Sequence, residues 1–168
     1  NLESLKQELL RIPAVTDVVY SSESPTQDNE NNNNFQLLAG DTHGAAMQTE
    51  LLNYHHMDYG FFEAYKVAPL AGRLFSKNFG TDEIKEATEG SVGTASVILN
   101  ESALKKFGFS TPEEAIGKTL AANVRGNQHL MIIGVIPDIY FRSVKFGIRA
   151  SVYMLDPLRF SVANISFN

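Results

Sequence analysis

The sequence has no cysteine among its 168 residues. This absence excludes disulfide frameworks, thiolate zinc sites and cysteine nucleophiles together, although it does not select a cellular compartment. Long apolar runs are missing too. The longest, interrupted only by one glycine, is 130–136 (LMIIGVI), far short of the ~20 residues of a membrane-spanning helix. The chain begins at Asn1 without a signal peptide, and we expect it to be part of a longer protein.

Positive charge is also scarce. The net charge is −5 and the isoelectric point is near 5.3, and lysine and arginine never exceed two in a row. These features exclude the basic footprint of a nucleic-acid-binding domain. A content of 43% hydrophobic and 20% charged residues is typical of a globular protein, built as one domain or two small lobes.

Recognisable catalytic motifs are absent from the sequence. No GxSxG elbow occurs, and no serine stands in a glycine-flanked turn beside a candidate base. The acidic pairs Asp82-Glu83 and Glu113-Glu114 are neighbours in the sequence, and such pairs are normally solvated charges rather than an acid and a base facing a substrate. We therefore predict no catalytic residue and no enzymatic activity.

Histidine is the remaining candidate metal ligand. His55 and His56 are adjacent on an expected strand, so their side chains should point to opposite faces and cannot easily share one ion. One is expected to be inward and structural and the other outward. A metal site would need His43 or Asp41 to converge with one of them, and no such arrangement follows from the spacing. We predict neither a metal nor a cofactor.

The segment 113–120 (EEAIGKTL) contains a Gly117-Lys118-Thr119 step that looks like the end of a nucleotide-binding P-loop. A P-loop needs a glycine at position 112, where this chain has proline. Thr111 as N-cap, Pro112 at the first helical position and Glu114 as the capping-box partner instead predict a short helix ending at Gly117. Lys118 would then follow the negative end of a helix, and no phosphate is expected there.

Helices and strands are interspersed without repeated βα units, which predicts an α+β domain. Asp58 is expected to cap a helix carrying Phe61, Phe62 and Tyr65, and Asn100 to cap the helix ESALKKF, closed by Gly108. The other expected elements are a helix over 2–12, an Asn-rich mobile surface loop over 22–34, a loop over 76–94, and strands over 15–21, 35–39, 48–55, 95–99, 118–124, 129–136, 150–155 and 160–167.

Three stretches, 64–76, 95–120 and 131–155, together resemble the extracytoplasmic core domain of MacB/FtsX-type ABC transporter permeases. The resemblance depends on the order and spacing of a GR-x-F motif, an NE pair before a small helix, an IGK step and an IGV strand followed by an acidic and an aromatic residue. We expect these motif positions to be structural. They are Gly72, Arg73, Phe75, Asn100, Glu101, Ile116, Gly117, Lys118, Ile133, Gly134, Val135, Asp138 and Phe141.

The resemblance implies a periplasmic or extracytoplasmic location, between the first and second membrane helices of an inner-membrane permease. It also implies that residues 1–168 form one core domain with two lobes. Residues 1–70 and 156–168 would form a porter-like α/β lobe, and 71–155 a smaller, strand-rich inserted lobe.

The function implied by the resemblance is non-catalytic. The domain would couple ATP hydrolysis, carried out by a separate cytoplasmic domain or subunit, to periplasmic conformational change in export, lipoprotein handling or signalling. Implied partners are the ABC ATPase, reached through the permease membrane helices, a second permease in a dimer, and a periplasmic adaptor, lipoprotein or sensor. An extracytoplasmic small-molecule sensor is the alternative, and it predicts an apolar pocket with a few converging polar groups.

Overall fold

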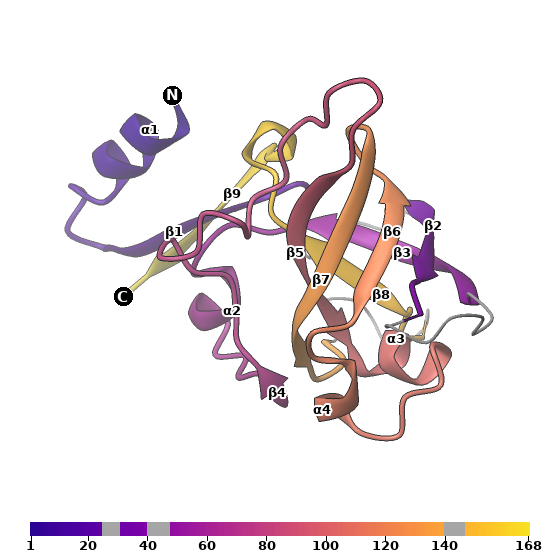
Figure 1. Ribbon diagram of the computed structural model, residues 1–168. Coiled ribbons are helices and arrows are strands. Elements are labelled where there is room, and N and C mark those ends of the chain that lie inside the picture. The colour runs from indigo at the N-terminus through magenta and orange to yellow at the C-terminus, as the bar shows by residue number, and fades with distance from the viewer. Residues whose placement is uncertain (25–30, 40–47, 140–146) are drawn as a thin grey trace.

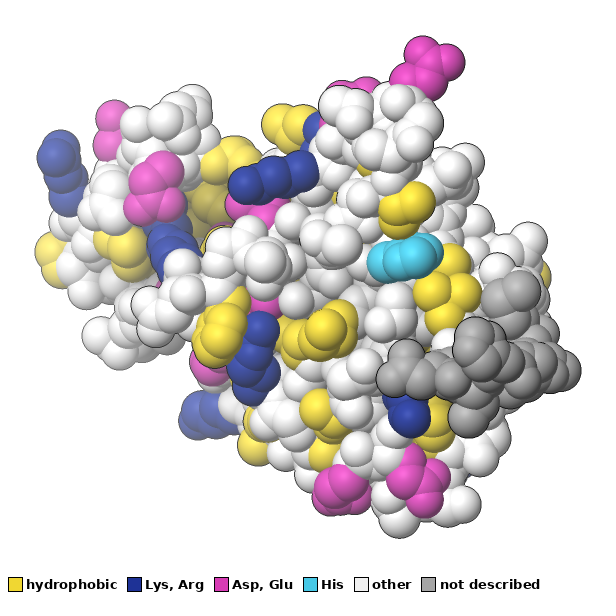
Figure 2. Space-filling view, viewed as in Figure 1, with side chains coloured by type: hydrophobic (Ala, Val, Ile, Leu, Met, Phe, Trp, Pro, Cys, Tyr) yellow, Lys and Arg dark blue, Asp and Glu magenta, His cyan; other side chains and the backbone are white. Residues whose placement is uncertain are grey.

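The computed structural model describes residues 1–24, 31–39, 48–139 and 147–168. The architecture is α+β, as predicted, and it consists of a strand-rich body beside a small unit that contains both chain termini (Figure 1). None of the helices in these residues is long and apolar enough to cross a membrane. On the face shown in Figure 2, lysine and arginine side chains are scattered among acidic and apolar ones rather than gathered over one element.

The small unit is formed by α1 (Leu2–Leu9), β1 (Val15–Ser21) and β9 (Val162–Phe167). β1 and β9 pair antiparallel, with Val15 opposite Phe167, so segments from the two ends of the sequence lie side by side. Buried side chains of β1 pack against α1, β9 and Phe160, and this apolar cluster holds the unit together: Val15, Val18 and Tyr20, with Leu9, Phe160 and Ile165 partly buried against them.

The body is a closed β-barrel. Its ring runs β7 (Asn127–Ile136), β5 (Gly93–Asn100), β8 (Ser151–Met154), β3 (Gln48–His56), β2 (Asn32–Leu37) and β6 (Thr119–Asn123), and the β6–β7 hairpin closes it. β6 pairs with the first half of β7, and the short β4 (Ala71–Gly72) pairs with Gly134 and Val135 in the second half.

Alternation along the strands fills the barrel interior. On β5, Val97 and Leu99 point inward while Ile98 between them faces outward. The same alternation on β8, and on β7 to either side of an irregularity at Ile133 and Gly134, places large apolar side chains inside a ring that is small enough to be filled by them. The buried interior side chains of the strands are Phe35, Leu52, Ala95, Val97, Leu99, Leu120, Leu130, Ile132, Val135, Val152 and Met154.

A second apolar layer covers the outer face of β5, β7 and β8. Phe61 and Phe62 from α2 (Phe61–Ala64), together with Phe75, pack against Ile98 and Tyr153. These three strands are thus buried on both faces, which explains why their sequences read as almost continuous apolar runs. In Figure 1, α2 and β4 lie beside the barrel, with α2 below β1 of the small unit and β4 below α2.

Short helices close one end of the barrel. α3 (Glu101–Lys106) follows β5 directly, and α4 (Pro112–Ala115) precedes β6. Ala103 and Leu104 of α3, together with Phe107 and Ala115, join the interior apolar cluster. A short 3-10 helix, η2 (Pro157–Arg159), follows β8 at the opposite end.

Most predicted strands are confirmed, and several local predictions are wrong. The expected helix 2–12 ends at Leu9, and the expected loop 22–34 is wrong from Asn32 onward, because backbone pairing with β3 draws this polar stretch into β2. Residues 25–30 lie outside the described part. Asp58 does not cap α2. Its carboxylate accepts hydrogen bonds from the N–H groups of Tyr20 and Tyr59, and Gly60, at a φ of 75°, precedes the helix.

The division into two lobes at residue 70 stays a prediction. The described sheet does not follow this boundary, because β2 pairs with β6 and β3 pairs with β8. Strands from both sides of residue 70 therefore share one barrel.

The close approach of the β4 and β7 backbones can be tested by substitution. A Cβ atom on Gly134 would lie 2.2 Å from the Arg73 carbonyl oxygen, whereas nothing lies within 4 Å of one on Gly80. We expect Gly134→Ala to lower the free energy of unfolding by about 1–3 kcal/mol, because backbone must move to admit the methyl group. Urea denaturation measures this. Gly80→Ala is the matched control, and equal stabilities of the two variants would contradict the tight crossing.

Candidate functional site

The motif residue Asn100 joins α3 to the barrel. Its side-chain oxygen accepts from the N–H groups of Ala103 (2.9 Å) and Ser151 (2.9 Å), and its amide donates to the Arg149 carbonyl (2.7 Å). The predicted N-cap is therefore confirmed, and the same side chain also bridges to the start of β8. Asn100 is only 2% exposed, so these bonds replace contacts with water.

Glu101 and Asp138 form a second bridge beside it. The Asp138 carboxylate accepts from the Ser102 N–H (2.9 Å) and hydroxyl (2.8 Å), and the Asp138 N–H donates to Glu101 (3.3 Å). The segment after β7 is thereby tied to the first turn of α3. The remaining motif aromatic, Phe141, lies outside the described residues.

Arg73 of the GR-x-F motif pairs with Asp82, which is fully buried. Two guanidinium nitrogens donate to the two carboxylate oxygens at 2.7 and 2.8 Å, and Ser96 donates its hydroxyl at 2.7 Å. Burial alone would raise the pKa of Asp82, but the hydrogen bonds from Arg73, Ser96 and the Ser76 N–H outweigh it and lower the pKa. The prediction that Asp82 is a solvated charge is therefore wrong.

The other motif positions lie where backbones cross. Gly72, at a φ of 70°, would place a Cβ atom 2.0 Å from the Ile133 carbonyl oxygen. Phe75 is buried in the outer apolar layer. The Gly117 N–H donates to the Ile132 carbonyl at 2.8 Å, which leads the chain from α4 into β6. Glycine at 72 allows the close approach of two main chains, whereas Gly117, with nothing within 4 Å of a Cβ atom, suits its φ of 83°.

Lys118 is exposed and follows α4, as the helix polarity predicted. Pro112 occupies the first helical turn, also as predicted, but the capping box is wrong in detail. The Thr111 side chain makes no cap hydrogen bond, and Glu114 accepts from the Ser110 N–H at 2.9 Å instead.

His55 and His56 point to opposite faces of β3. The His55 ring stacks on Tyr153 outside the barrel and contacts Glu23, whereas His56 faces the interior beside Tyr54. His43 and Asp41, the residues that a metal site would have required, lie outside the described residues. Within the described ranges no group of three or more potential metal ligands comes together.

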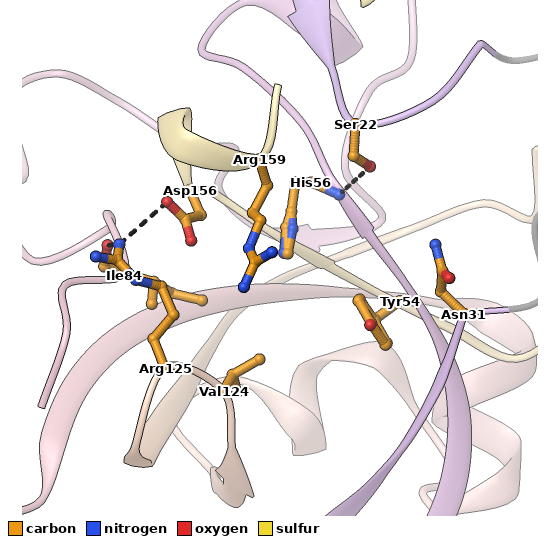
Figure 3. A pocket seen from close by; sticks show the side chains of 9 residues that line it. All are labelled: Ser22, Asn31, Tyr54, His56, Ile84, Val124, Arg125, Asp156 and Arg159. Carbon is orange, nitrogen blue, oxygen red and sulfur yellow. Dashed lines mark hydrogen bonds and ion pairs between the residues drawn. The ribbon is translucent and has the colours of Figure 1, made fainter. Parts of the chain in front are cut away.

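A cavity of about 280 Å³ opens at the barrel end opposite α3 (Figure 3). Its lining comes from the end of β3, the β6–β7 turn and the segment around η2, and includes Tyr54, His56, Val124, Arg125, Asp156 and Arg159. Arg125 donates to Asp156 at 3.2 Å, and Asp156 in turn accepts from the Leu158 N–H at 3.1 Å. This region is called the barrel mouth below.

His56 is the buried titratable group of the barrel mouth. It is 5% exposed, and its Nε2 has no hydrogen-bond partner among the residues that the structure describes. Burial lowers the pKa of His56 to about 4, so the ring is neutral at physiological pH. A neutral imidazole offers one donor and one acceptor, which suits it to bind a ligand rather than to serve as a fixed charge.

Comparison with known proteins then decides the family. A family profile described as the MacB-like periplasmic core domain matches residues 1–166. The chain belongs to this family. It is an extracytoplasmic domain of a MacB-like ABC transporter permease. A sequence comparison with curated proteins finds no match.

Solved structures share the fold of the MacB-like core domain at low sequence identity. The extracellular domain of the noncanonical ABC-type transporter YknZ from Gram-positive bacteria has a TM-score of 0.58 at 16% identity. A domain of a putative permease from Porphyromonas gingivalis has a TM-score of 0.59 at 14% identity. The periplasmic region of MacB from Actinobacillus actinomycetemcomitans has a TM-score of 0.52 at 16% identity. Each of the three comparisons covers 99% of this chain. The matched part is 72% of the YknZ domain, 66% of the Porphyromonas gingivalis domain and 64% of the MacB region.

The sequence analysis missed the barrel mouth. Its lining residues come from segments that are far apart in the sequence and share no motif spacing. The one local signal was Asp156 before Pro157, a helix-start pattern that marks η2 and orients the Asp156 carboxylate toward Arg125.

The buried Asp82 generates a prediction about pH. Its folded pKa lies below the unfolded value of about 3.9, so the carboxylate stabilises the fold above about pH 4, and this contribution is lost as the pH falls through the folded pKa. We expect Asp82→Asn to destabilise the domain by about 1–3 kcal/mol at neutral pH, and the difference from wild type to shrink on acidification.

Urea denaturation at a series of pH values measures both effects. The exposed Glu89→Gln is the control for loss of one negative charge and should change stability little. A difference between Asp82→Asn and wild type that stays constant down to about pH 2 would contradict the stabilising role of the ionised carboxylate.

Proposed function

We propose that this domain couples cytoplasmic ATP hydrolysis to conformational change outside the membrane. The observation that carries the proposal is the pairing of β1 with β9. The barrel lies between these two strands in the sequence, so both connections to the barrel leave from one hydrogen-bonded unit. A displacement of the unit would therefore move both connections together, as in the rigid-body shifts common in switching proteins.

The junction between the small unit and the barrel is firmly bonded. The Ser22 N–H donates to the His56 carbonyl at 2.9 Å, and the Asp58 N–H donates to the Tyr20 carbonyl at 3.0 Å. Phe160 packs against both the unit and the outer layer of the barrel, and its ring stacks on Tyr20. These contacts favour transmission of movement over independent motion of the two parts.

The surface of α1 supports contact with further protein. Leu2 is 38% exposed and Leu5 45% exposed, and no residue of α1 is buried. Apolar side chains exposed on one short helix are typical of a contact surface. In our proposal this unit connects to the permease membrane helices and through them to the ABC ATPase. A second permease copy and a periplasmic adaptor, lipoprotein or sensor are the other proposed partners.

The proposal predicts movement in the assembled transporter. A cysteine at the exposed position Lys105 on α3, in a parent protein otherwise freed of cysteine, allows one spin label in each copy of the domain. We expect the distance distribution between the two labels to differ between the nucleotide-free and ATP-bound states, because the barrels move with the membrane part. Double electron–electron resonance measures the distances.

A second label pair, both within one barrel, is the control for local rearrangement. Cysteines at Lys105 and Glu89 place labels on α3 and on the loop before β5. This distance should stay constant while the distance between copies changes. Identical inter-copy distributions in all nucleotide states of an active transporter would contradict coupling through this domain.

Lys118 provides a separate prediction. It is exposed and follows the carboxyl end of α4, so it is not placed to bind nucleotide phosphates. Lys118→Ala should therefore leave ATP hydrolysis by the assembled parent complex within about twofold of wild type. Phosphate release by the purified complex measures this, and complete loss of activity in a folded, assembled variant would contradict the proposed division of labour.

A further inference from the structure

The barrel mouth carries an unbalanced positive charge. Two arginines line it, Arg125 and Arg159, against a single lining carboxylate, Asp156. Asp156 is 1% exposed and pairs with Arg125, and the exposed Glu86 lies farther from Arg125, at 3.8 Å. The positive charge of Arg125 is therefore already balanced within the fold, mainly by Asp156.

Arg159 is the second arginine and stands apart from this pair. Among the residues that the structure describes, its guanidinium has no hydrogen-bond or ion-pair partner. In Figure 3 the guanidinium extends from η2 into the cavity, between the side chains of Asp156 and His56 and above that of Val124. A guanidinium carries paired donors at a spacing that matches a carboxylate or a phosphate.

His56 adds a second unsatisfied group to the same cavity. Its side chain is buried, with only 5% of the residue exposed, and its Nε2 lacks a partner among the described residues. A buried polar atom without a hydrogen bond is unfavourable, so a hydrogen-bonding group of a ligand in this cavity would remove that cost. The main chain at His56 is fixed, because its backbone N–H donates to the Ser22 hydroxyl at 3.0 Å.

The remaining walls are apolar. Ile84 is 1% exposed and belongs to the interior cluster, and Val124 and Tyr54 are partly buried against the same cluster. A ligand in the barrel mouth would therefore meet charge and hydrogen bonds on one side and hydrocarbon on the other. The volume of about 280 Å³ is just below the range of about 300–1,000 Å³ for ligand pockets, which suits a small ligand.

We propose that the barrel mouth binds a small organic monocarboxylate, whose carboxylate contacts Arg159 and His56 and whose apolar body contacts Tyr54, Ile84 and Val124. One free guanidinium balances one negative charge. A doubly charged phosphate would place its second charge near Asp156 without a cation to meet it. This inference does not depend on the proposed coupling function.

Benzoate and its neutral analogue benzamide test the proposal on the full domain. Isothermal titration should show saturable 1:1 binding of benzoate at concentrations up to about 10 mM, and benzamide should bind at least about tenfold more weakly. The His56 ring resonances should shift during the benzoate titration, which places the ligand in the barrel mouth.

Variants then assign the contacts. Arg159→Gln should weaken benzoate binding by about tenfold or more, and His56→Phe, which keeps a buried ring, by about threefold to tenfold. Arg11→Gln removes the same charge at an exposed position just after α1, outside the cavity lining, and should bind benzoate as wild type does. Circular dichroism confirms that each variant is folded. Arg159 is exposed, so its replacement should not unfold the domain.

Three results would overturn the inference. They are absence of saturable benzoate binding, equal binding of benzamide, and unchanged binding by folded Arg159→Gln. Inorganic phosphate that binds more tightly than benzoate, with the same dependence on Arg159, would also overturn the carboxylate assignment. None of these outcomes bears on nucleotide-dependent movement of the domain, so they are distinguishable from failure of the coupling proposal.

Discussion

The hydrogen bonding of β7 along both of its edges is the constraint on which the rest of the structure depends. One edge is occupied by β5, and the other is shared between β6 and β4. This sharing closes the barrel near its mouth and leaves room for β4 to bring Arg73 to Asp82. It requires two backbones to approach more closely than a side chain permits, which explains glycine at positions 72 and 134.

The two ends of the barrel differ in how far their polar groups are hydrogen-bonded. At one end, Asn100 and Asp138 satisfy the backbone around α3, and the apolar side of α3 closes the interior. At the other end, the β6–β7 turn and η2 bring charged side chains together without satisfying all of them. The described residues that carry the family resemblance do not line the barrel mouth.

Local patterns in the sequence predicted the parts of the fold that are decided locally. Asn100 follows a buried strand and precedes a helix, so its capping role could be predicted and is confirmed. Closure of the barrel could not be predicted, because apolar alternation does not specify which strands pair with one another. Asn32–Asn34 have weak strand propensity and enter β2 only because β3 offers partners. His56 and Arg159 meet through the tertiary fold alone, and no spacing in the sequence connects them.

The pairing of β1 with β9 has a consequence for the order in which the chain can fold. The barrel strands have all been made before β9 is available, whereas β1 must wait for a partner from the opposite end of the sequence. Contacts between distant segments form slowly because a large loop must close first. Until then Val15, Val18 and Tyr20 lack part of the cover that they have in the native state. Until β9 has been made, this strand is therefore an unpaired apolar edge of the kind that promotes aggregation.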